Sequence, residues 1–333
     1  MTDTTDVVEL TARMMEIDST SEREGPLVDW VESYLTGAEW RVWRLPVTPG
    51  RDDIFATCVD APLVTLSTHL DTVPPFIPPR LDGDTLWGRG ACDAKGIAAA
   101  MIVAADRLRT TGVPVALLFV VGEEVTHDGA VAANRVPTTS RVLINGEPTE
   151  STLAIGTKGA MRFTLRTRGQ AAHSAYPHLG RSAIHDLVRL LSELEHLALP
   201  SDPMLGDTTI NIGGIEGGVA DNVIAPSAEA RCMARLVTPA AELEHLLRNW
   251  VGERAAFERG ITVELARLGT LPDFPTSVAA YATDIPKLTN WGKPYLFGPG
   301  SIHVAHRDDE HVRVSELRSA VDAYVRIATE AMG

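Results

Sequence analysis

Two apolar patterns alternate along the first half of the chain. Apolar residues recur at helical spacing in Asp6–Met15 and Gly25–Leu35, whereas Val64–Leu66, Val115–Val121 and Val142–Ile144 are short unbroken apolar runs rich in β-branched residues. Unbroken runs of this kind are typical of strands buried on both faces of a parallel sheet, with helices as the crossover connections. The first half of the chain therefore predicts an α/β layer domain.

A third helix is predicted over Ala94–Thr110, between the first two of these strands. Its apolar residues form a single stripe, Asp93 stands in the position of an N-cap residue, and Gly112 lies just past the end. An N-cap aspartate accepts hydrogen bonds from the free N–H groups of a first turn, and glycine readily adopts the left-handed conformation that ends a helix.

The pattern changes near residue 157, where alternating segments replace the unbroken runs. Four strands and two helices are expected there in the order β-α-β-β-α-β, which is that of a ferredoxin-like unit. The strands are Met161–Thr167, Thr208–Ile215, Ala228–Val237 and Ile261–Leu268, and the helices are Ser182–Leu197 and the segment that Thr238 caps and Pro239 begins.

The chain returns to the first type of pattern after Pro272. A helix over Val278–Lys287, a strand over Tyr295–Phe297 and a helix over Asp309–Met332 are predicted there. The ferredoxin-like module is therefore expected to be an insertion into the α/β domain. The expected division assigns residues 1–157 and 270–333 to the α/β domain and residues 158–269 to the inserted domain.

Composition limits the classes of partner. The 333 residues include 44 acidic and 30 basic side chains, a formal net charge of −14, and 44% are hydrophobic, as in chains that bury real cores. An acidic excess of this size repels nucleic-acid phosphates and anionic lipid surfaces. We therefore expect neither a nucleic acid nor a membrane as a partner.

The sequence also predicts a cytoplasmic location. The longest apolar stretches, Ile97–Ala105 and Val113–Val121, are far shorter than the roughly 20 residues that a membrane-spanning helix needs. Residues 1–6 are polar and acidic, unlike a signal peptide. The three cysteines are widely spaced and form no Cys-x-x-Cys pair, so we expect reduced thiols rather than disulfides or a cysteine zinc site.

Acidic and histidine side chains follow the ends of the predicted strands. They are His69 and Asp71 after the first strand, Glu123 and Glu124 after the second, Glu147 after the third and His306 after the last. The carboxyl ends of strands in an open α/β sheet meet in one crevice, so these groups are expected to converge there with Asp93. Several carboxylates in one crevice repel each other unless a cation neutralises them. Histidines combined with carboxylates suit Zn²⁺, Co²⁺ or Mn²⁺.

Each of these groups also has an ordinary structural interpretation. Asp71 either orients the imidazole of His69, two residues away, or is an unrelated surface acid beside a structural histidine. The pair Glu123-Glu124 is either a catalytic base beside a metal ligand or a solvated acidic turn, and Asp93 is either a ligand or only an N-cap. The coincidence of all these groups at successive strand ends favours the metal site.

Five segments carry these residues. They are Ser67-Thr-His-Leu-Asp71, Trp87-Gly-Arg-Gly-Ala-Cys-Asp-Ala-Lys-Gly96, Gly122-Glu-Glu124, Asn145-Gly-Glu147 and Gly298-Pro-Gly-Ser-Ile-His-Val-Ala-His306. In order and over nearly the whole chain, they resemble the motifs of the M20 metallopeptidase family, which includes acetylornithine deacetylase, succinyl-diaminopimelate desuccinylase and glutamate carboxypeptidase. The resemblance implies a zinc-peptidase-like catalytic domain with an inserted lid and dimerisation domain.

The resemblance also implies a pair of zinc ions, with Co²⁺ or Mn²⁺ as alternatives. His69 and Glu147 would hold one ion, Glu124 and His306 the other, and Asp93 would bridge both. These five residues are the expected metal ligands, and Glu123 is the expected general base and acid. Two adjacent metal ions acidify a bridging water and polarise an amide carbonyl.

The inserted module resembles the lid and dimerisation domain of the family, which implies a homodimer. His173 in Ala171-Ala-His-Ser-Ala175 would reach the active site of a partner subunit and help to hold the oxyanion. Asn222 and Arg235 match positions that bind the carboxylate of a substrate, a task suited to a guanidinium. Arg231 is the alternative to Arg235.

The expected reaction is removal of an acyl group from an N-acyl amino acid, as in acetylornithine deacetylase. Gly298–Ile302, followed by Ala-His and by Asp309-Glu310, resembles that enzyme, and Glu147 stands where strict dipeptidase and tripeptidase relatives carry aspartate. Ser301 replaces an acid found in many relatives. The alternatives are an aminopeptidase or carboxypeptidase acting on short peptides, a succinyl-diaminopimelate desuccinylase, and an inactive binding protein on the same fold.

The remaining histidines are predicted to be ordinary surface or helix residues. They are His127, His178, His185, His196, His245, His303 and His311.

Overall fold

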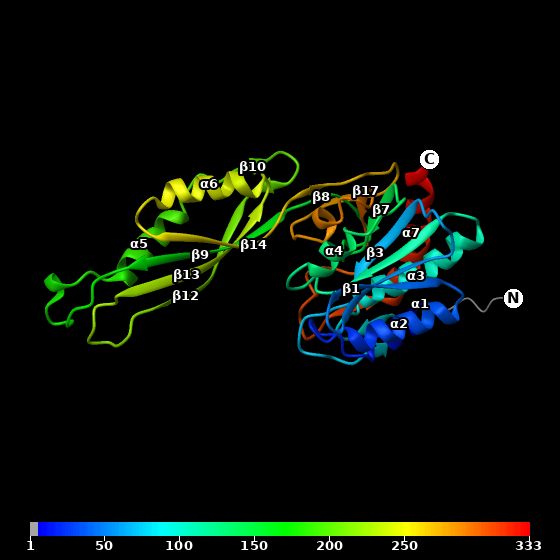
Figure 1. Ribbon diagram of the computed structural model, residues 1–333, viewed down its shortest axis with the longest axis horizontal. Coiled ribbons are helices and arrows are strands. Elements are labelled where there is room, and N and C mark those ends of the chain that lie inside the picture. Colours follow the sequence, from blue (N-terminus) through cyan, green and yellow to red (C-terminus); the bar gives the residue numbers. More distant parts are fainter. Residues whose placement is uncertain (1–5) are drawn as a thin grey trace. The chain divides into compact units, whose positions relative to one another are not determined.

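The computed structural model describes residues 6–333, which form two compact units (Figure 1). The first unit contains the described part of Met1–Ile155 together with Arg267–Ser277 and Thr283–Gly333, and the second contains Gly156–Ala266 with Val278–Ala282. The second unit therefore includes a further short segment, residues 278–282, that lies outside the inserted domain of residues 158–269 expected from the sequence. Residues 1–5, on which the argument against a signal peptide partly rests, lie outside the described residues.

A six-stranded sheet with the order β1-β2-β6-β3-β7-β17 forms the centre of the first unit. Its strands are β1 (Arg41–Thr48), β2 (Arg51–Thr57), β3 (Val64–His69), β6 (Val115–Val120), β7 (Val142–Asn145) and β17 (Lys293–Leu296). The last four, the three predicted apolar runs and the strand predicted at Tyr295–Phe297, are parallel, whereas β2 pairs antiparallel with both β6 and β1. Every residue of β3, β6 and β7 is buried, as expected for strands covered on both faces.

Helices pack against both faces of this sheet. They are α1 (Val7–Met15), α2 (Gly25–Gly37), α3 (Lys95–Thr110), α4 (Asp128–Ala133) and α7 (Val314–Met332). Alternate residues of β6 divide between two cores, because Leu117 and Phe119 join the cluster that includes α1, α2, α3 and α7, while Leu118 and Val120 join the one beneath α4. The predicted α/β layer domain is confirmed.

Short elements complete the first unit and its connections. A three-stranded sheet has the order β18-β5-β4 and another has the order β15-β8-β16. Their strands are β4 (Arg80–Asp82), β5 (Thr85–Trp87), β18 (His311–Arg313), β8 (Leu153–Thr157), β15 (Ala266–Arg267) and β16 (Thr276–Ala279), and a 3₁₀ helix η2 spans Ile285–Lys287.

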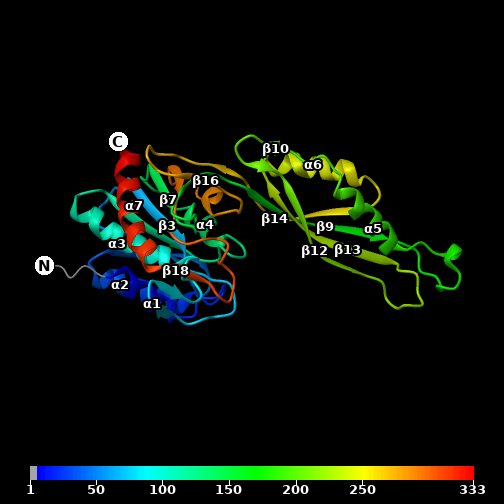
Figure 2. The same ribbon diagram turned by 180° about the vertical axis from the view of Figure 1, so that it is seen from behind.

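The second unit is a four-stranded antiparallel sheet with two helices on one face (Figure 2). Its main elements are β9 (Gly159–Arg168), α5 (Ala183–Leu194), β12 (Thr209–Gly217), β13 (Ser227–Leu236), α6 (Ala240–Val251) and β14 (Ala256–Val263), with η1 (Pro177–Leu179), β10 (Ser201–Asp202) and β11 (Gly206–Asp207) in the connections. The sheet order β12-β13-β9-β14 is that of a ferredoxin-like unit, so this prediction is confirmed.

The helix predicted over Val278–Lys287 is wrong. Residues 276–279 form β16, since Leu153 N–H donates to Pro275 O and Lys158 N–H donates to Ala279 O. Only the turn Ile285–Lys287 is helical, as η2. Strand pairing with β8 overrides the helical preference of the alanines, and Pro286 opposes a longer helix.

The helix predicted over Asp309–Met332 begins only at Val314, because residues 311–313 form β18. Two predicted N-cap residues are also wrong. The N-cap of α3 is Ala94, and the carboxylate of Asp93 faces two histidines rather than the helix. Pro239, rather than Thr238, is the N-cap of α6, and Glu264 accepts the N–H of Ala240 at 3.0 Å. In α6, the side chain of Glu264 therefore accepts a free N–H of the first turn, the task that the side chain of Thr238 was predicted to perform.

Among the described residues, no helix combines the length and apolar character needed to cross a membrane. The expected cytoplasmic location stays a prediction.

Candidate metal centre

The carboxyl ends of the parallel strands bring the predicted ligands to one edge of the large sheet. His69 is the buried last residue of β3, and its Nε2 lies 3.1 Å from Asp93 Oδ1 and 3.9 Å from Glu147 Oε2. Its Nδ1 lies 2.9 Å from the backbone oxygen of Asp71. Because a carbonyl oxygen only accepts, Nδ1 carries a proton, so Nε2 is the nitrogen that offers a lone pair to a metal ion once the proton it shares with Asp93 is displaced.

A second histidine lies next to the other carboxylate oxygen of Asp93. His306 Nε2 lies 3.3 Å from Asp93 Oδ2 and 3.0 Å from Glu124 Oε2. Ligand atoms of His69, Asp93 and Glu124 all lie within 4.8 Å of one another. One carboxylate with a histidine at each oxygen is the arrangement that a ligand shared by two metal ions requires.

Glu147 supplies a direct indication that a cation belongs here. Its side chain is buried, and its Oε1 has no hydrogen-bond partner among the described residues. A buried carboxylate oxygen without a partner is costly, and binding a metal ion satisfies it. The donor set of two imidazoles and three carboxylates also fits divalent transition metals. The residues present therefore fit the metal pair that the family resemblance implies.

Asp71 holds the turn that carries Glu123 and Glu124. Its two carboxylate oxygens accept the backbone N–H groups of Glu123 and Glu124, each at 3.1 Å, and Oδ2 also accepts from Ser21 Oγ. Its carboxylate lies 3.6 Å from His69 Nδ1, beyond hydrogen-bond distance. One of the two sequence interpretations had this carboxylate orient the imidazole, whereas the hydrogen bond to Nδ1 comes from the backbone oxygen of Asp71.

Glu310 holds the segment that carries Asp93. Its Oε1 accepts backbone N–H groups from Gly90, Cys92 and Asp93 at 3.0 to 3.2 Å, and its Oε2 accepts from Arg89 Nη1 at 2.7 Å. Glu310 and Arg89 are both fully buried. The charge-assisted bonds fix the backbone of Asp93, so its carboxylate is held between the two histidines before any ligand arrives.

The site has strongly perturbed protonation. Burial raises the pKa values of the Glu123 and Glu147 carboxyls well above their usual range. Burial also acts to raise the pKa of Asp93, but hydrogen bonds with His306 and His69 outweigh it and the net shift is downward. Hydrogen bonds to Asp93 and Glu124 raise the pKa of His306 to about 10. A metal ion at Nε2 of His306 must therefore displace a proton.

Two residues beside Glu123 were missed by the sequence interpretation. His127 Nδ1 lies 3.7 Å from Glu123 Oε1 and 2.8 Å from Asp284 Oδ1, and both His127 and Asp284 are buried. The four-residue spacing from Glu123 was the only local signal for His127, which was predicted to be an ordinary surface or helix residue. Asp284 follows no apolar strand, so no pattern pointed to it.

The remaining predicted site residues lie in the second unit. His173 forms a β-bridge with Val223, and Ser174 N–H donates to Asn222 O, so His173 and Asn222 are neighbours. Arg235 pairs with Ala160 at the start of β9, at the other end of the sheet. Arg231 is bound to Glu216 at 3.0 Å, whereas Arg235 has no ion pair among the described residues.

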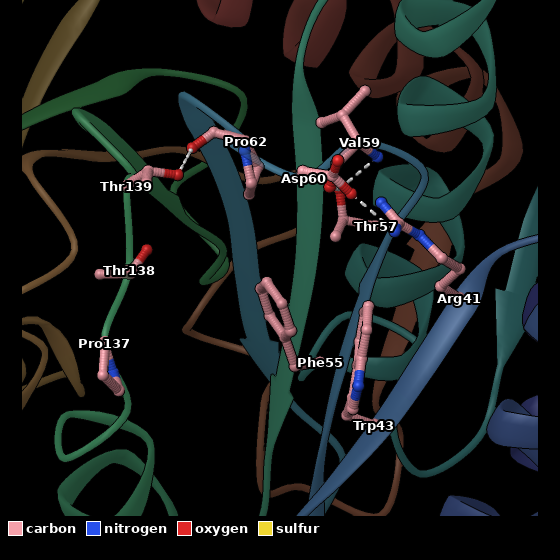
Figure 3. Close-up of a pocket in the computed structure, with 10 residues that line it drawn as sticks. All are labelled: Arg41, Trp43, Phe55, Thr57, Val59, Asp60, Pro62, Pro137, Thr138 and Thr139. Atoms are coloured by element: carbon pink, nitrogen blue, oxygen red, sulfur yellow. Dashed lines mark hydrogen bonds and ion pairs between the residues drawn. The ribbon is translucent and has the colours of Figure 1, made fainter.

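A hollow of about 330 Å³ on the first unit is a separate feature (Figure 3). It lies near Pro62, before β3 begins, and Thr139, before β7 begins, and is therefore at the amino ends of the parallel strands. Its charged residues, Arg41 and Asp60, pair with each other at 2.8 Å. The hollow thus offers neither the metal ligands nor the free charges found at the carboxyl ends.

The fold and the site together define a metal-dependent hydrolase: buried carboxylates with one buried and one half-exposed histidine at the carboxyl edge of an α/β sheet, and a ferredoxin-like module inserted. A family model described as the M20 peptidase dimerisation domain matches residues 155–257. A peptidase M20 domain-containing protein of Schizosaccharomyces pombe is 37% identical, over 96% of this chain and 84% of its own. A probable carboxypeptidase of Aspergillus terreus is 38% identical, over 96% and 85%. The chain belongs to the M20 peptidase family and is a hydrolase of amide or peptide bonds.

Solved structures agree with the fold. A tripeptidase from Staphylococcus aureus superposes with a TM-score of 0.82 at 16% identity, covering 97% of both chains. A protein from Bacillus subtilis described as a dinuclear metal-binding peptidase of the M20 family superposes with a TM-score of 0.72 at 15% identity, covering 97% of this chain and 96% of its own. The expected zinc-peptidase-like fold with an inserted dimerisation domain is confirmed.

Proposed function

We propose that this protein is a two-metal peptidase that releases the C-terminal residue of short peptides. The curated relatives at 37 to 38% identity carry the names of an M20 peptidase and a carboxypeptidase, which supports the peptidase alternative over the acetylornithine deacetylase expected from the sequence. The loop Gly298–Ile302 suggested the deacetylase, but it is a short segment set against similarity over nearly the whole chain.

The observation that carries the proposal is the position of Asp93, with one oxygen toward His69 and the other toward His306. We assign His69 and Glu147 to one ion, His306 and Glu124 to the other, and Asp93 to both. Zinc is the ion that we propose, because imidazole and carboxylate ligands suit it. When bound, two such ions acidify a water and polarise the scissile carbonyl.

Glu123 performs the proton transfers in this proposal. Its carboxylate is largely buried and lies next to the proposed ligands without a hydrogen bond to either ligand histidine among the described residues. It accepts the proton of the attacking water and then donates it to the leaving amine. Burial raises the pKa of its carboxyl, and a higher pKa strengthens its hold on the proton taken from the water until the amine leaves.

The second unit supplies substrate-binding groups. Arg235, which has a half-buried side chain and no carboxylate partner among the described residues, is proposed to bind the C-terminal carboxylate of the peptide. His173 is proposed to stabilise the oxyanion, and Asn222 to hold the substrate beside it.

The separation of these groups supports a homodimer. Strands rise about 3.3 Å per residue, so Arg235 lies roughly 26 Å along β13 from Ser227, the end near which His173 and Asn222 lie. One short peptide cannot touch both ends of one sheet. We propose that one chain provides Arg235 and a partner copy provides His173 and Asn222, in keeping with the dimerisation domain that the family model describes.

Mixing two inactive variants tests the dimer. His173→Ala and Glu123→Ala homodimers should each be nearly inactive, and a mixed dimer should have one site with both wild-type residues. We expect activity to reappear after subunit exchange, up to about a quarter of wild type per chain from one intact site in half of the dimers. No activity in mixtures shown to have exchanged subunits contradicts the assignment of His173 to the partner's site.

A substrate panel tests the reaction. The zinc-loaded protein is assayed with dipeptides and tripeptides, the same tripeptides amidated at the C-terminus, N-acetylornithine and N-succinyl-diaminopimelate, and the released amino acid is identified. We expect cleavage of the free-acid peptides with release of the C-terminal residue, and loss of most of kcat/KM on amidation. Turnover of N-acetylornithine without peptide cleavage contradicts the proposal and supports the acetylornithine deacetylase prediction instead.

A further inference from the structure

Three side chains meet beside the proposed ligand set without belonging to it. His127 Nδ1 lies 2.8 Å from Asp284 Oδ1 and 3.7 Å from Glu123 Oε1. The side chains of His127 and Glu123 are each 11% exposed and that of Asp284 is 2% exposed, so all three are shielded from solvent. Asp284 lies 157 positions away in the sequence and precedes η2, so only the fold brings it to His127.

The backbone turns His127 back toward Glu123. The N–H groups of Thr126 and His127 both donate to Gly122 O, at 3.0 and 2.7 Å, which closes the turn between β6 and α4. His127 has φ 56°, in the left-handed region, where histidine and asparagine occur more often than most residues. The closed turn sets the imidazole edge against the carboxylate of the residue four positions earlier.

The donor and acceptor roles follow from the chemistry of the groups. An ionised carboxylate only accepts hydrogen bonds, so Nδ1 of His127 carries a proton and donates it to Asp284. Glu123 Oε1 lies 3.7 Å from the same nitrogen, too far for a hydrogen bond of its own. The partial positive charge at this edge of the imidazole attracts the oxygen without a hydrogen bond, so the carboxylate stays free to accept a proton.

We infer that His127, fixed by Asp284, positions the carboxylate of Glu123 for proton transfer. The inference rests on the proposed role of Glu123 as general base. His127 and Asp284 are positioning residues in this scheme, because neither lies among the groups assigned to the metal ions or to the substrate. A displacement of a reacting group by about 1 Å costs up to about a hundredfold in rate, which sets the size of the expected effect.

Two substitutions at one position isolate the N–H. His127→Asn keeps a donor near the position of Nδ1 and tolerates the left-handed backbone, whereas His127→Gly tolerates the same backbone and removes the donor. We expect His127→Gly to lose about tenfold to a hundredfold in kcat with KM changed less than about threefold, and His127→Asn to recover most of that loss. His196→Gly, at an exposed histidine of the second unit, is the matched control and should behave as wild type.

Asp284→Ala tests the second half of the pair. It should lower kcat about as much as His127→Gly. The double variant of His127→Gly and Asp284→Ala should have a kcat only slightly below that of either single variant, because both substitutions remove the same His127–Asp284 contact. Metal content per chain, measured on each zinc-loaded variant, should equal that of wild type.

Several results would overturn the inference. Full kcat in His127→Gly, equal losses in the Asn and Gly variants, or additive losses in the double variant would each exclude positioning through the N–H. Loss of bound metal in His127→Asn would make His127 a ligand instead. Glu123→Gln is assayed in parallel: if it is fully active, the proposed function of Glu123 fails, whereas an inactive Glu123→Gln beside a fully active His127→Gly overturns only this inference.

Discussion

Replacing Glu123 with glutamine should lower kcat by about a hundredfold to ten-thousandfold while leaving both metal ions bound. Glutamine has nearly the shape of glutamate but cannot take a proton, and a positioned general base contributes a rate factor of about this size. The Glu123 carboxylate lies 3.7 Å from His127 Nδ1, and the backbone N–H of Glu123 donates to Asp71, so the substitution leaves the proposed ligand set unchanged. The measurements are steady-state kinetics and elemental analysis of metal per chain.

The neighbouring residue provides the control for this experiment. Glu124 lies 3.0 Å from His306 and is assigned to an ion, so Glu124→Gln should lower the metal content as well as the activity. If Glu123→Gln loses metal and Glu124→Gln keeps it, the roles of the two residues are exchanged.

Removing the metal ions should abolish turnover and lower the melting temperature. Without a cation, the buried carboxylates of Asp93, Glu124 and Glu147 repel one another and the oxygen of Glu147 stays unpaired. An ion present at 100 times its Kd stabilises a folded chain by about 2.7 kcal/mol, and we therefore expect chelation to lower Tm by roughly 5 to 10 °C. Added Zn²⁺ or Co²⁺ should restore both properties, and full activity in excess chelator contradicts the metal site.

The same experiment has a defined pH dependence. The pKa of His306 is raised to about 10, so at pH 7 a proton occupies the nitrogen that the ion needs. Raising the pH removes this competitor, and the affinity for the ion should increase up to about tenfold per pH unit for each proton displaced. Titrations with a metal indicator between pH 6 and pH 8 measure the slope. Asp93→Asn removes the shared carboxylate and should bind fewer ions at every pH, whereas Asp82→Asn, at an exposed position, should bind as wild type.

Local pattern was a good guide where burial determined structure. Val115–Val121 was predicted as a doubly buried strand because every position is apolar, and β6 is buried at every residue. Since parallel strands end at one edge of a sheet, the positions of His69, Glu124 and Glu147 followed from where the apolar runs stop. The structure brings these side chains to one edge, within the distances expected for shared ligands.

Local pattern failed where a distant partner competed with it. The alanines near Val278 favour a helix, but β8 offers unpaired backbone groups and the segment pairs with it as β16. Asp93 has the chemistry of an N-cap, but Glu310 already accepts its backbone N–H and two histidines attract its carboxylate. In both cases the deciding contact joins residues more than 100 positions apart in the sequence.

The sequence by itself determined the layer architecture, the ferredoxin-like order of the second unit and the family, because periodicity and short motifs are local properties. Only the tertiary structure decided what supports the chemistry. The bonds from Glu310 to the segment of Asp93, and from Asp284 to His127, join residues 217 and 157 positions apart. Such contacts depend on how the elements pack, and neither the spacing of apolar residues nor the identity of neighbours along the chain encodes them.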